Sequence, residues 1–473
     1  MKSSPNSDDA GEMTPSANGE ETPGDGHHRY ELPATPKIGE SAGLGVYGLF
    51  ESQTEIIERD DFCSLAPIGW LHHKMQDSFF LVVGTGSCQG FLQTALGVMI
   101  FAKPRFATAM LDEDDLGGAD ALDGLRPLVA AIVKEHAPRA IFLASTCTPE
   151  ILKMNIAGCA PPLEAEFGVR VYPCRLDGFD PAYTQGEDHV LEAMIERAPQ
   201  TEAKNLVILG CISPLEEAEI RLECAAMGLP VPEFLPAESA LELPAIGPNT
   251  VLAPVQPYLF GAAAYALRER GTPMHKTLFP FGPDGTRAFY ETLAAAFGKS
   301  VSYADRERDV WAALKPTTDV LRGKAIAFCS DAMLELPIAR TLRAGGATIP
   351  VLGTPNIYKK FHALELAALE GVEILERPDR YDLFARFLAA KPDLVVANLN
   401  VANPLEGMGL AVKWSTELTF QPIHGFSGAS TLFGMFASSI KRHEALAARR
   451  KRDGSQPAPI DLHYFRQIEK VGA

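Results

Sequence analysis

Short apolar runs alternate with longer amphipathic stretches along most of the chain. Residues 79–83 form an aromatic and β-branched run that ends at two nearby glycines, as expected for a strand buried on both faces. From Gln89 the apolar positions recur every three or four residues until Pro104, which predicts a helix. The pattern therefore predicts Cys88 in the turn between them. A thiol there suits a metal ligand, because helix N-termini stabilise thiolates, although this stretch alone favours a small buried residue.

The same alternation continues to about residue 400. Strands that alternate with helices are typical of βαβ units and parallel sheets, which bind ligands at the carboxyl ends of their strands. We expect an α/β fold of three Rossmann-like, doubly wound domains over residues 39–180, 181–320 and 321–440. Further strands are predicted at residues 105–111, 140–145, 169–174, 205–210, 250–255, 324–330, 348–353 and 393–399.

The two ends of the chain differ from this pattern. Residues 1–38 are rich in Ser, Pro, Gly, Asp and Glu, so they cannot bury enough apolar surface to offset the entropy of ordering. We expect a disordered N-terminal tail there. Residues 441–473 are polar and partly basic, which predicts a C-terminal extension.

Composition excludes several classes of protein. A chain of 473 residues is too long for one core, and its net charge of -17 argues against nonspecific nucleic-acid binding. No apolar run is long enough to span a bilayer, and the N-terminus lacks the layout of a signal peptide, so we expect a cytoplasmic protein without a membrane span. The 8 cysteines are scattered, which favours thiols over a disulfide framework.

Three cysteines share one kind of position. Cys63 precedes a predicted helix, and Cys147 follows the predicted strand 140–145 as Cys88 follows its own strand. Three thiolates are one short of the four that usually hold an iron–sulfur cluster. Because Cys174 and Cys211 also fall at strand ends, spacing alone does not select this set.

A nucleotide site is not expected in this chain. Residues 298–300, Gly-Lys-Ser, resemble the end of a phosphate-binding loop, but Leu293 stands where that motif needs its first glycine. The residues before it are predicted to be a helix rather than a strand. No G-x-G-x-x-G fingerprint follows a strand either.

Several segments in order resemble one known family. They are FCSLAPIGWLHHKMQDSFFLVVGTGSCQGFLQTALGVMIFAKPRF from Phe62, STCTPEILK around Cys147, TQGEDHVLEAM from Thr184, LPAIGPNTV from Leu243 and ANPLEGMGLAVKWSTELTF from Ala402. From about Phe62 to about residue 436 the chain is similar to the N subunits of light-independent protochlorophyllide reductases, which are nitrogenase-like. The resemblance implies a nitrogenase component 1-like fold.

The resemblance also implies a cofactor and partners. Cys63, Cys88 and Cys147 match the N-subunit ligands of a [4Fe-4S] cluster, and the fourth ligand is an aspartate of the B subunit. N and B subunits form an N2B2 heterotetramer, to which a separate iron–sulfur reductase dimer delivers electrons as it hydrolyses ATP. The proton donors are not in the N subunit, so no catalytic residue is expected in this chain.

The implied reaction belongs to chlorophyll and bacteriochlorophyll biosynthesis. It is reduction of the C17=C18 double bond in ring D of protochlorophyllide to give chlorophyllide a. Phe62, Trp414 and Phe420 match apolar positions of the pigment pocket, although each by itself is more often an ordinary core residue.

Three alternatives remain. A nitrogenase-like scaffold for cluster assembly would share the fold, but the TQGED and KWSTELTF segments argue against it. A chlorophyllide reductase subunit would act on another ring, and its cysteine segments differ. In a non-enzymatic binding protein the cysteines would be core residues, and the purified protein would be colourless and free of iron.

Overall fold

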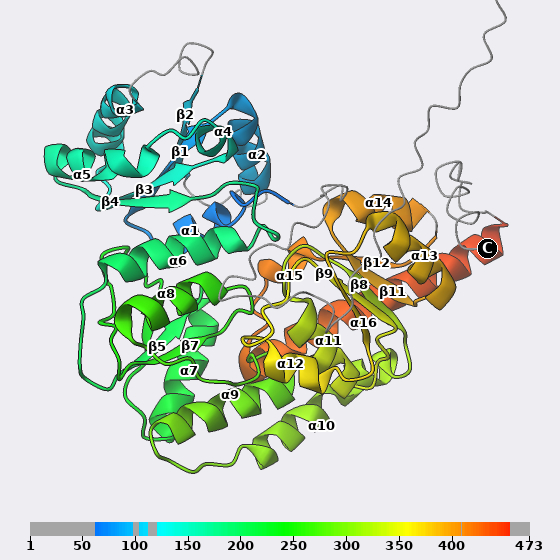
Figure 1. Cartoon of the computed structure of the whole chain (residues 1–473). Helices are drawn as coiled ribbons and strands as arrows, with labels where there is room; N and C mark the ends of the chain where they lie inside the picture. The colour runs from blue at the N-terminus through cyan, green and yellow to red at the C-terminus, as the bar shows by residue number, and fades with distance from the viewer. Residues whose placement is uncertain (1–61, 98–103, 112–120, 408, 455–473) are drawn as a thin grey trace, which may run out of the picture. The chain divides into compact units, whose positions relative to one another are not determined.

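Three parallel β-sheets, each flanked by helices, make up the described part of the chain (Figure 1). The computed structural model describes residues 62–97, 104–111, 121–407 and 409–454. The predicted tail at residues 1–38 lies outside them, as do residues 455–473 of the predicted extension. The prediction of an α/β fold with doubly wound parallel sheets is confirmed.

The first sheet has the strand order β2-β1-β3-β4. Strand order reverses between β1 and β3, so this pair is the switch point of the sheet, outside which ligands usually bind. The strands are β1 (Ser78–Gly84), β2 (Phe106–Met110), β3 (Ala140–Ser145) and β4 (Arg170–Arg175), and the helices are α1 (Ile68–Lys74), α2 (Gly86–Gly97), α3 (Ala121–His136), α4 (Cys147–Ile151) and α5 (Ile156–Phe167).

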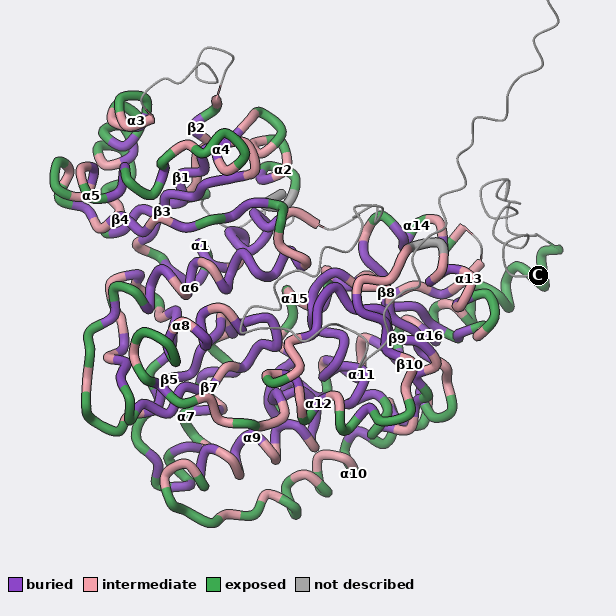
Figure 2. Tube along the Cα trace, in the orientation of Figure 1, coloured by how far each residue is buried: buried purple, intermediate pink, exposed green. Residues whose placement is uncertain are grey.

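Strand β1 is buried along its whole length, as its apolar run predicts (Figure 2). Phe79 and Leu81 pack in one core cluster with residues of α3 and α5. Phe80 and Val82 pack in another with residues of α1 and the following helices. Helices on both faces therefore explain why the strand lacks polar alternation.

The second sheet is smaller, with the order β6-β5-β7 and its switch point between β5 and β7. Helix α6 contacts both strand β4 of the first sheet and helix α8. The elements are α6 (Gln185–Arg197), β5 (Leu206–Leu209), α7 (Pro214–Ala226), β6 (Glu233–Leu235), β7 (Val251–Pro254), α8 (Phe260–Arg270), α9 (Gly282–Ala296) and α10 (Ala304–Leu321).

The third sheet has the order β10-β9-β8-β11-β12, with its switch point between β8 and β11. The long helix α16 contacts α7, α9 and α10. The elements are β8 (Ile326–Cys329), α11 (Glu335–Ala344), β9 (Val351–Thr354), α12 (Ala363–Ala368), β10 (Glu373–Glu376), α13 (Arg380–Ala390), β11 (Leu394–Ala397), α14 (Leu399–Gly407), β12 (Val412–Trp414), α15 (Thr416–Thr419) and α16 (Gly425–Asp453).

Three strands were not predicted from the sequence. β6, β10 and β12 have only 3, 4 and 3 residues, and all three lie at sheet edges. Each contains a charged residue, so none shows the uninterrupted apolar run by which central strands such as β5 and β11 were predicted. Each predicted domain range contains one sheet, but the exact boundaries stay a prediction. Helix α16 crosses the proposed boundary at residue 440 without a break.

The Gly-Lys-Ser segment follows helix α9, as predicted, and not a strand. Its Lys299 donates a hydrogen bond to the Gly228 carbonyl at 2.7 Å, which gives the side chain a structural partner. Among the helices that the structure describes, none is both long and apolar enough to cross a membrane.

One buried arginine connects helices that belong to the third sheet with a helix that belongs to the second sheet. Arg340 on α11 is paired with Glu365 of α12 at 2.7 Å and with Asp284 of α9 at 2.6 Å. Its guanidinium also donates to the carbonyls of Phe279 and Phe281. The side chain of Arg340 thus binds all of these groups, and Arg340 is almost fully buried.

Replacement of Arg340 by alanine should strongly destabilise the protein. The change leaves Glu365 buried without its counter-charge, which typically costs about 3–5 kcal/mol. Urea unfolding followed by tryptophan fluorescence would measure the loss. Arg308→Ala is the control, because Arg308 is exposed and pairs only with its neighbours Asp305 and Asp309. Equal stability of the two variants would contradict this role.

Candidate metal centre and neighbouring cavity

The three singled-out cysteines gather at the carboxyl edge of the first sheet. Cys88 and Cys147 follow β1 and β3, the two strands of the switch point. Cys63 lies in the segment before α1, as predicted. The prediction that Cys88 precedes its helix was wrong: α2 begins at Gly86, because the turn after β1 needs only one residue.

Two of the sulfurs have polar neighbours. Cys147 Sγ accepts a hydrogen bond from the Gly178 N–H at 3.1 Å. Cys88 Sγ lies 3.8 Å from Thr85 Oγ1, where either atom can donate, and donates toward Thr146 Oγ1 at 3.8 Å. The N–H donor would stabilise a thiolate, so the Cys147 position suits metal-bound sulfur.

The third sulfur, that of Cys63, interacts electrostatically with the other two cysteines. Burial raises the pKa of the Cys63 thiol to about 11, against the lowering effect of the Leu65 N–H. The negative charges of Cys147, Cys88 and Asp177 raise this pKa further. Negative charge on these neighbours therefore disfavours ionisation of Cys63, and a bound cationic group would favour it.

Two glycines allow the chain segments around the cysteines to pack closely against their neighbours. A Cβ on Gly84 would lie 2.6 Å from Thr146 Oγ1 and 2.8 Å from Cys88 Sγ. A Cβ on Gly186, in the first turn of α6, would lie 2.1 Å from the Ser64 carbonyl oxygen. The position of the Cys63 segment thus depends on the absence of a side chain at residue 186.

Within the described residues, no group of three or more His, Cys, Asp or Glu side chains could hold a metal ion. The three cysteines therefore do not make a mononuclear site by themselves. A cubane cluster holds its thiolates farther apart than a single ion does. The convergence of three thiols, one of which accepts a backbone N–H, fits a group of that kind.

The other cysteines lie in different surroundings. Cys159, Cys174 and Cys224 are buried, and burial raises the pKa of Cys174 to about 12. Cys211 and Cys329 are at the ends of β5 and β8, in the other two sheets. Tertiary structure thus places Cys211 and Cys329 in other sheets, and it buries Cys174 in the core although Cys174 lies opposite Ala144 near the carboxyl end of β4.

A buried carboxylate connects two of the three predicted pigment-pocket positions. Asp331, after β8, accepts a hydrogen bond from the Phe62 backbone N–H at 2.9 Å and one from the Ser415 hydroxyl at 3.1 Å. Trp414 precedes Ser415 and packs in the core cluster of the third sheet. Sequence analysis missed Asp331, whose only signal is its place just after a strand.

Phe62 and Phe420 are linked through other aromatic residues. Phe62 contacts Tyr183 edge to face at 5.4 Å, and the Tyr183 hydroxyl bonds to Thr419, the neighbour of Phe420. Phe420 in turn contacts Trp70 edge to face at 5.4 Å. Of the three predicted positions, Phe420 also lines a cavity that neither Phe62 nor Trp414 reaches.

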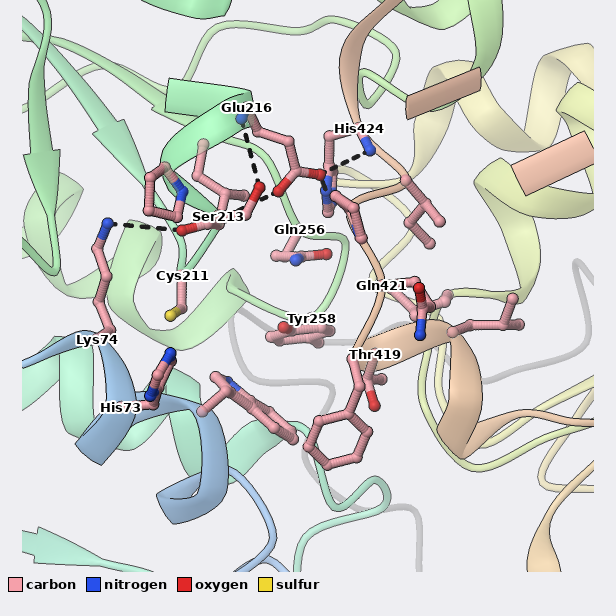
Figure 3. A pocket seen from close by; sticks show the side chains of 18 of the residues that line it. His73, Lys74, Cys211, Ser213, Glu216, Gln256, Tyr258, Thr419, Gln421 and His424 are labelled. Atoms are coloured by element: carbon pink, nitrogen blue, oxygen red, sulfur yellow. Dashed lines mark hydrogen bonds and ion pairs between the residues drawn. The ribbon is translucent and has the colours of Figure 1, made fainter. Parts of the chain in front are cut away.

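This cavity has a volume of about 400 Å³ and is formed by α1, the ends of β5 and β7, and residues 418–424 (Figure 3). Beside it lies Glu187, fully buried, which accepts hydrogen bonds from Trp70 Nε1–H, the Tyr258 hydroxyl and the Cys211 N–H. Burial raises the pKa of Glu187 to about 7, although these donors lower it. Glu187 belongs to the TQGED segment, but its role was not predicted.

Of two adjacent histidines on α1, His72 faces the core and His73 faces solvent. His72 is buried, with Nδ1 2.7 Å from the Ile68 carbonyl, and burial lowers its pKa. His73 is exposed and lies at the cavity. Neither joins the cysteines.

The family of the chain is shown by comparison with known proteins. Residues 63–441 match the family model described as "Nitrogenase component 1 type Oxidoreductase". The solved structure "Nitrogenase Cp1 at pH 6.5" matches with a TM-score of 0.66 over 84% of this chain and 96% of that chain. At 16% identity this likeness concerns the fold alone.

Curated relatives are more similar. "Light-independent protochlorophyllide reductase subunit N" of Roseiflexus sp. (strain RS-1) is 46% identical, over 81% of this chain and 92% of the relative. The protein of the same name from Chlorobaculum tepidum (strain ATCC 49652 / DSM 12025 / NBRC 103806 / TLS) is 44% identical, over 84% and 95%.

The fold and the cysteine edge thus define a subunit of a nitrogenase-like oxidoreductase, a class that implies iron–sulfur chemistry. Within it, the chain belongs to the family of light-independent protochlorophyllide reductase N subunits. The name subunit N marks those relatives as parts of a larger assembly. The predicted family is therefore confirmed.

Gly186→Ala should displace the Cys63 segment. The added methyl group meets a backbone carbonyl that cannot rotate away, so we expect a loss of about 1–3 kcal/mol in unfolding free energy. Hydrogen exchange should also become faster in residues 62–67. Gly90→Ala, in helix α2 with no heavy atom within 4 Å of the new Cβ, is the matched control and should not destabilise. Unchanged exchange in the Gly186 variant would contradict the close approach.

Glu187→Gln should change how stability depends on pH. The folded-state pKa of Glu187 is raised to about 7, so its protonated form favours folding, and this contribution is lost as pH rises from the unfolded value of 4.5 to about 7. Relative to the wild type, the variant should gain about 2–3 kcal/mol between those pH values. Urea unfolding at several pH values measures this. A stability difference that does not vary with pH would refute the shifted carboxyl.

Proposed function

We propose that this chain is the N subunit of a complex that reduces the C17=C18 double bond in ring D of protochlorophyllide to give chlorophyllide a. The observation that carries the proposal is the convergence of Cys63, Cys88 and Cys147 at the switch point of the first sheet. In a chain of this family, that edge is suited to iron–sulfur ligation rather than to core packing.

The cysteines would hold a [4Fe-4S] cluster, which supplies single electrons at low potential when bound. The chain offers three thiolates, and the fourth ligand is proposed to be an aspartate of the B subunit. The N–H of Gly178 donates to Cys147 and orients it, and the Thr85 hydroxyl is placed to do the same for Cys88. Such second-shell bonds fix ligand direction and tune potential.

Exposed apolar side chains beside this edge support a partner there. Ile151 and Leu152 follow Cys147 along α4 and are 65% and 40% exposed. Phe179, next to the Gly178 that bonds Cys147, is 52% exposed. A covering subunit would bury them and exclude water from the sulfurs, in an N2B2 arrangement.

The pigment is proposed to lie against Phe62, Trp414 and Phe420. The Asp331 bridge holds the segments of the first two, and the contact with Trp70 orients the third. Aromatic faces suit a flat conjugated ring. The chain's own part is to bind and orient the pigment and exclude water, and ATP is proposed to be hydrolysed by the separate iron–sulfur reductase dimer.

Cysteine substitution tests the proposal. Cys63→Ser, Cys88→Ser and Cys147→Ser should each lower iron content or perturb the EPR signal of the anaerobically purified complex with the B subunit. Turnover of protochlorophyllide with ATP, the reductase component and a reductant should be lost. Cys159→Ala, Cys174→Ala and Cys224→Ala are controls, since these buried thiols are not among the proposed ligands, and they should keep the signal at a moderate stability cost. Full iron and full activity in Cys88→Ser would disprove the ligand assignment.

A further inference from the structure

The turn that follows β4 lies directly beside Cys147. Strands β3 and β4 pair in parallel, and the Leu176 N–H extends this pairing by donating to the Ser145 carbonyl at 2.8 Å. The two chain segments therefore leave the sheet side by side. Two residues further on, the Gly178 N–H donates to Cys147 Sγ at 3.1 Å. The proposed ligand thus takes its backbone donor from the end of the neighbouring strand.

The backbone at Gly178 is pressed close to this sulfur. A Cβ added at Gly178 would lie 3.3 Å from Cys147 Sγ, closer than an ordinary van der Waals contact. At this distance a rotation of the peptide group between residues 177 and 178 would turn the N–H away from the sulfur. The hydrogen bond to Cys147 therefore depends on whatever fixes this turn.

Asp177 fixes the turn from the inside. Its Oδ1 accepts a hydrogen bond from the Phe179 N–H at 2.9 Å, the bond from a side chain to the backbone two residues on that defines an Asx turn. Asp177 is fully buried, whereas Gly178 and Phe179 are exposed. The carboxylate thus bonds the peptide group on one side of Gly178 and is attached to the residue on the other side.

Charged neighbours hold the carboxylate in place. Asp177 Oδ2 lies 3.1 Å from Arg175 Nε, and Arg175 also pairs with Asp180 at 3.5 Å. Asp180 in turn lies 2.8 Å from His189 Nε2 on α6. Burial raises the pKa of Asp177, while the Phe179 N–H and the charge of Arg175 lower it. The turn is therefore tied to both β4 and α6, and Asp177 is the buried member of this set.

We propose that Asp177 is a positioning residue for the iron–sulfur cluster, because its side chain holds the Gly178 N–H against Cys147 and thereby tunes the reduction potential. This inference rests on the proposed function, in which Cys147 is a ligand. Reduction adds negative charge, part of which resides on the ligand sulfurs, and an N–H donor stabilises that charge. Loss of the donor should therefore lower the potential, while the three cysteines remain available to bind iron.

The test compares Asp177→Asn with Asp177→Ala in the anaerobically purified complex with the B subunit. Both changes remove the charge, but asparagine keeps an oxygen for the Phe179 N–H, so a difference between the variants reports the turn alone. Hydrogen exchange in residues 177–180 should stay as slow as in the wild type for Asp177→Asn and become about 5- to 10-fold faster for Asp177→Ala. The midpoint potential, from a redox titration followed by EPR, should be lower in Asp177→Ala than in Asp177→Asn.

Asp177→Ser takes the place of the alanine variant if that complex does not assemble, because a serine hydroxyl forms such a turn more weakly than an asparagine side chain. Its exchange should then be faster, and its potential lower, than in Asp177→Asn. Equal potentials in the paired variants would overturn the inference alone, as would equal exchange in residues 177–180. A wild-type complex without an iron–sulfur signal would overturn the proposed function, and with it the role of Asp177.

Discussion

The parallel pairing of β1 with β3 is the constraint on which the candidate centre depends. Because both strands run in the same direction, their carboxyl ends meet at one edge, and the chain leaves them in opposite directions. Cys88 and Cys147 follow these two ends directly, so their approach is a consequence of strand register. Because Gly84 has no Cβ, Cys88 Sγ and Thr146 Oγ1 can both lie against the end of β1. A shift in this register would separate the two sulfurs.

Buried carboxylates extend this arrangement to the other sheets. Asp331 ties the Phe62 backbone to Ser415, and Glu187 gathers Trp70, Tyr258 and the Cys211 N–H. Ionisable groups so deeply buried are costly unless donors surround them. Each therefore holds segments distant in the sequence at defined positions.

Prediction from the sequence succeeded where the signal was local. Long apolar strands such as β1 and β3 are buried on both faces, and their composition alone identifies them. The segment motifs indicated the family correctly. Short edge strands such as β12 were missed, since a charged residue interrupts their apolar run. Asp331 and Glu187 were missed as well, because nothing near them in the sequence distinguishes a buried, hydrogen-bonded carboxylate from an exposed one.

The sequence by itself determined the alternation of strands and helices, the parallel sheets that follow from it, and the placement of cysteines next to helix starts. These are short-range properties, set by apolar periodicity and turn residues. Only the tertiary structure decided which cysteines converge: Cys174 is buried within β4 and Cys211 ends a strand of another sheet, although both resembled Cys147 in spacing. Strand order and close packing at Gly186 are long-range properties, and no local pattern encodes which strand ends become neighbours.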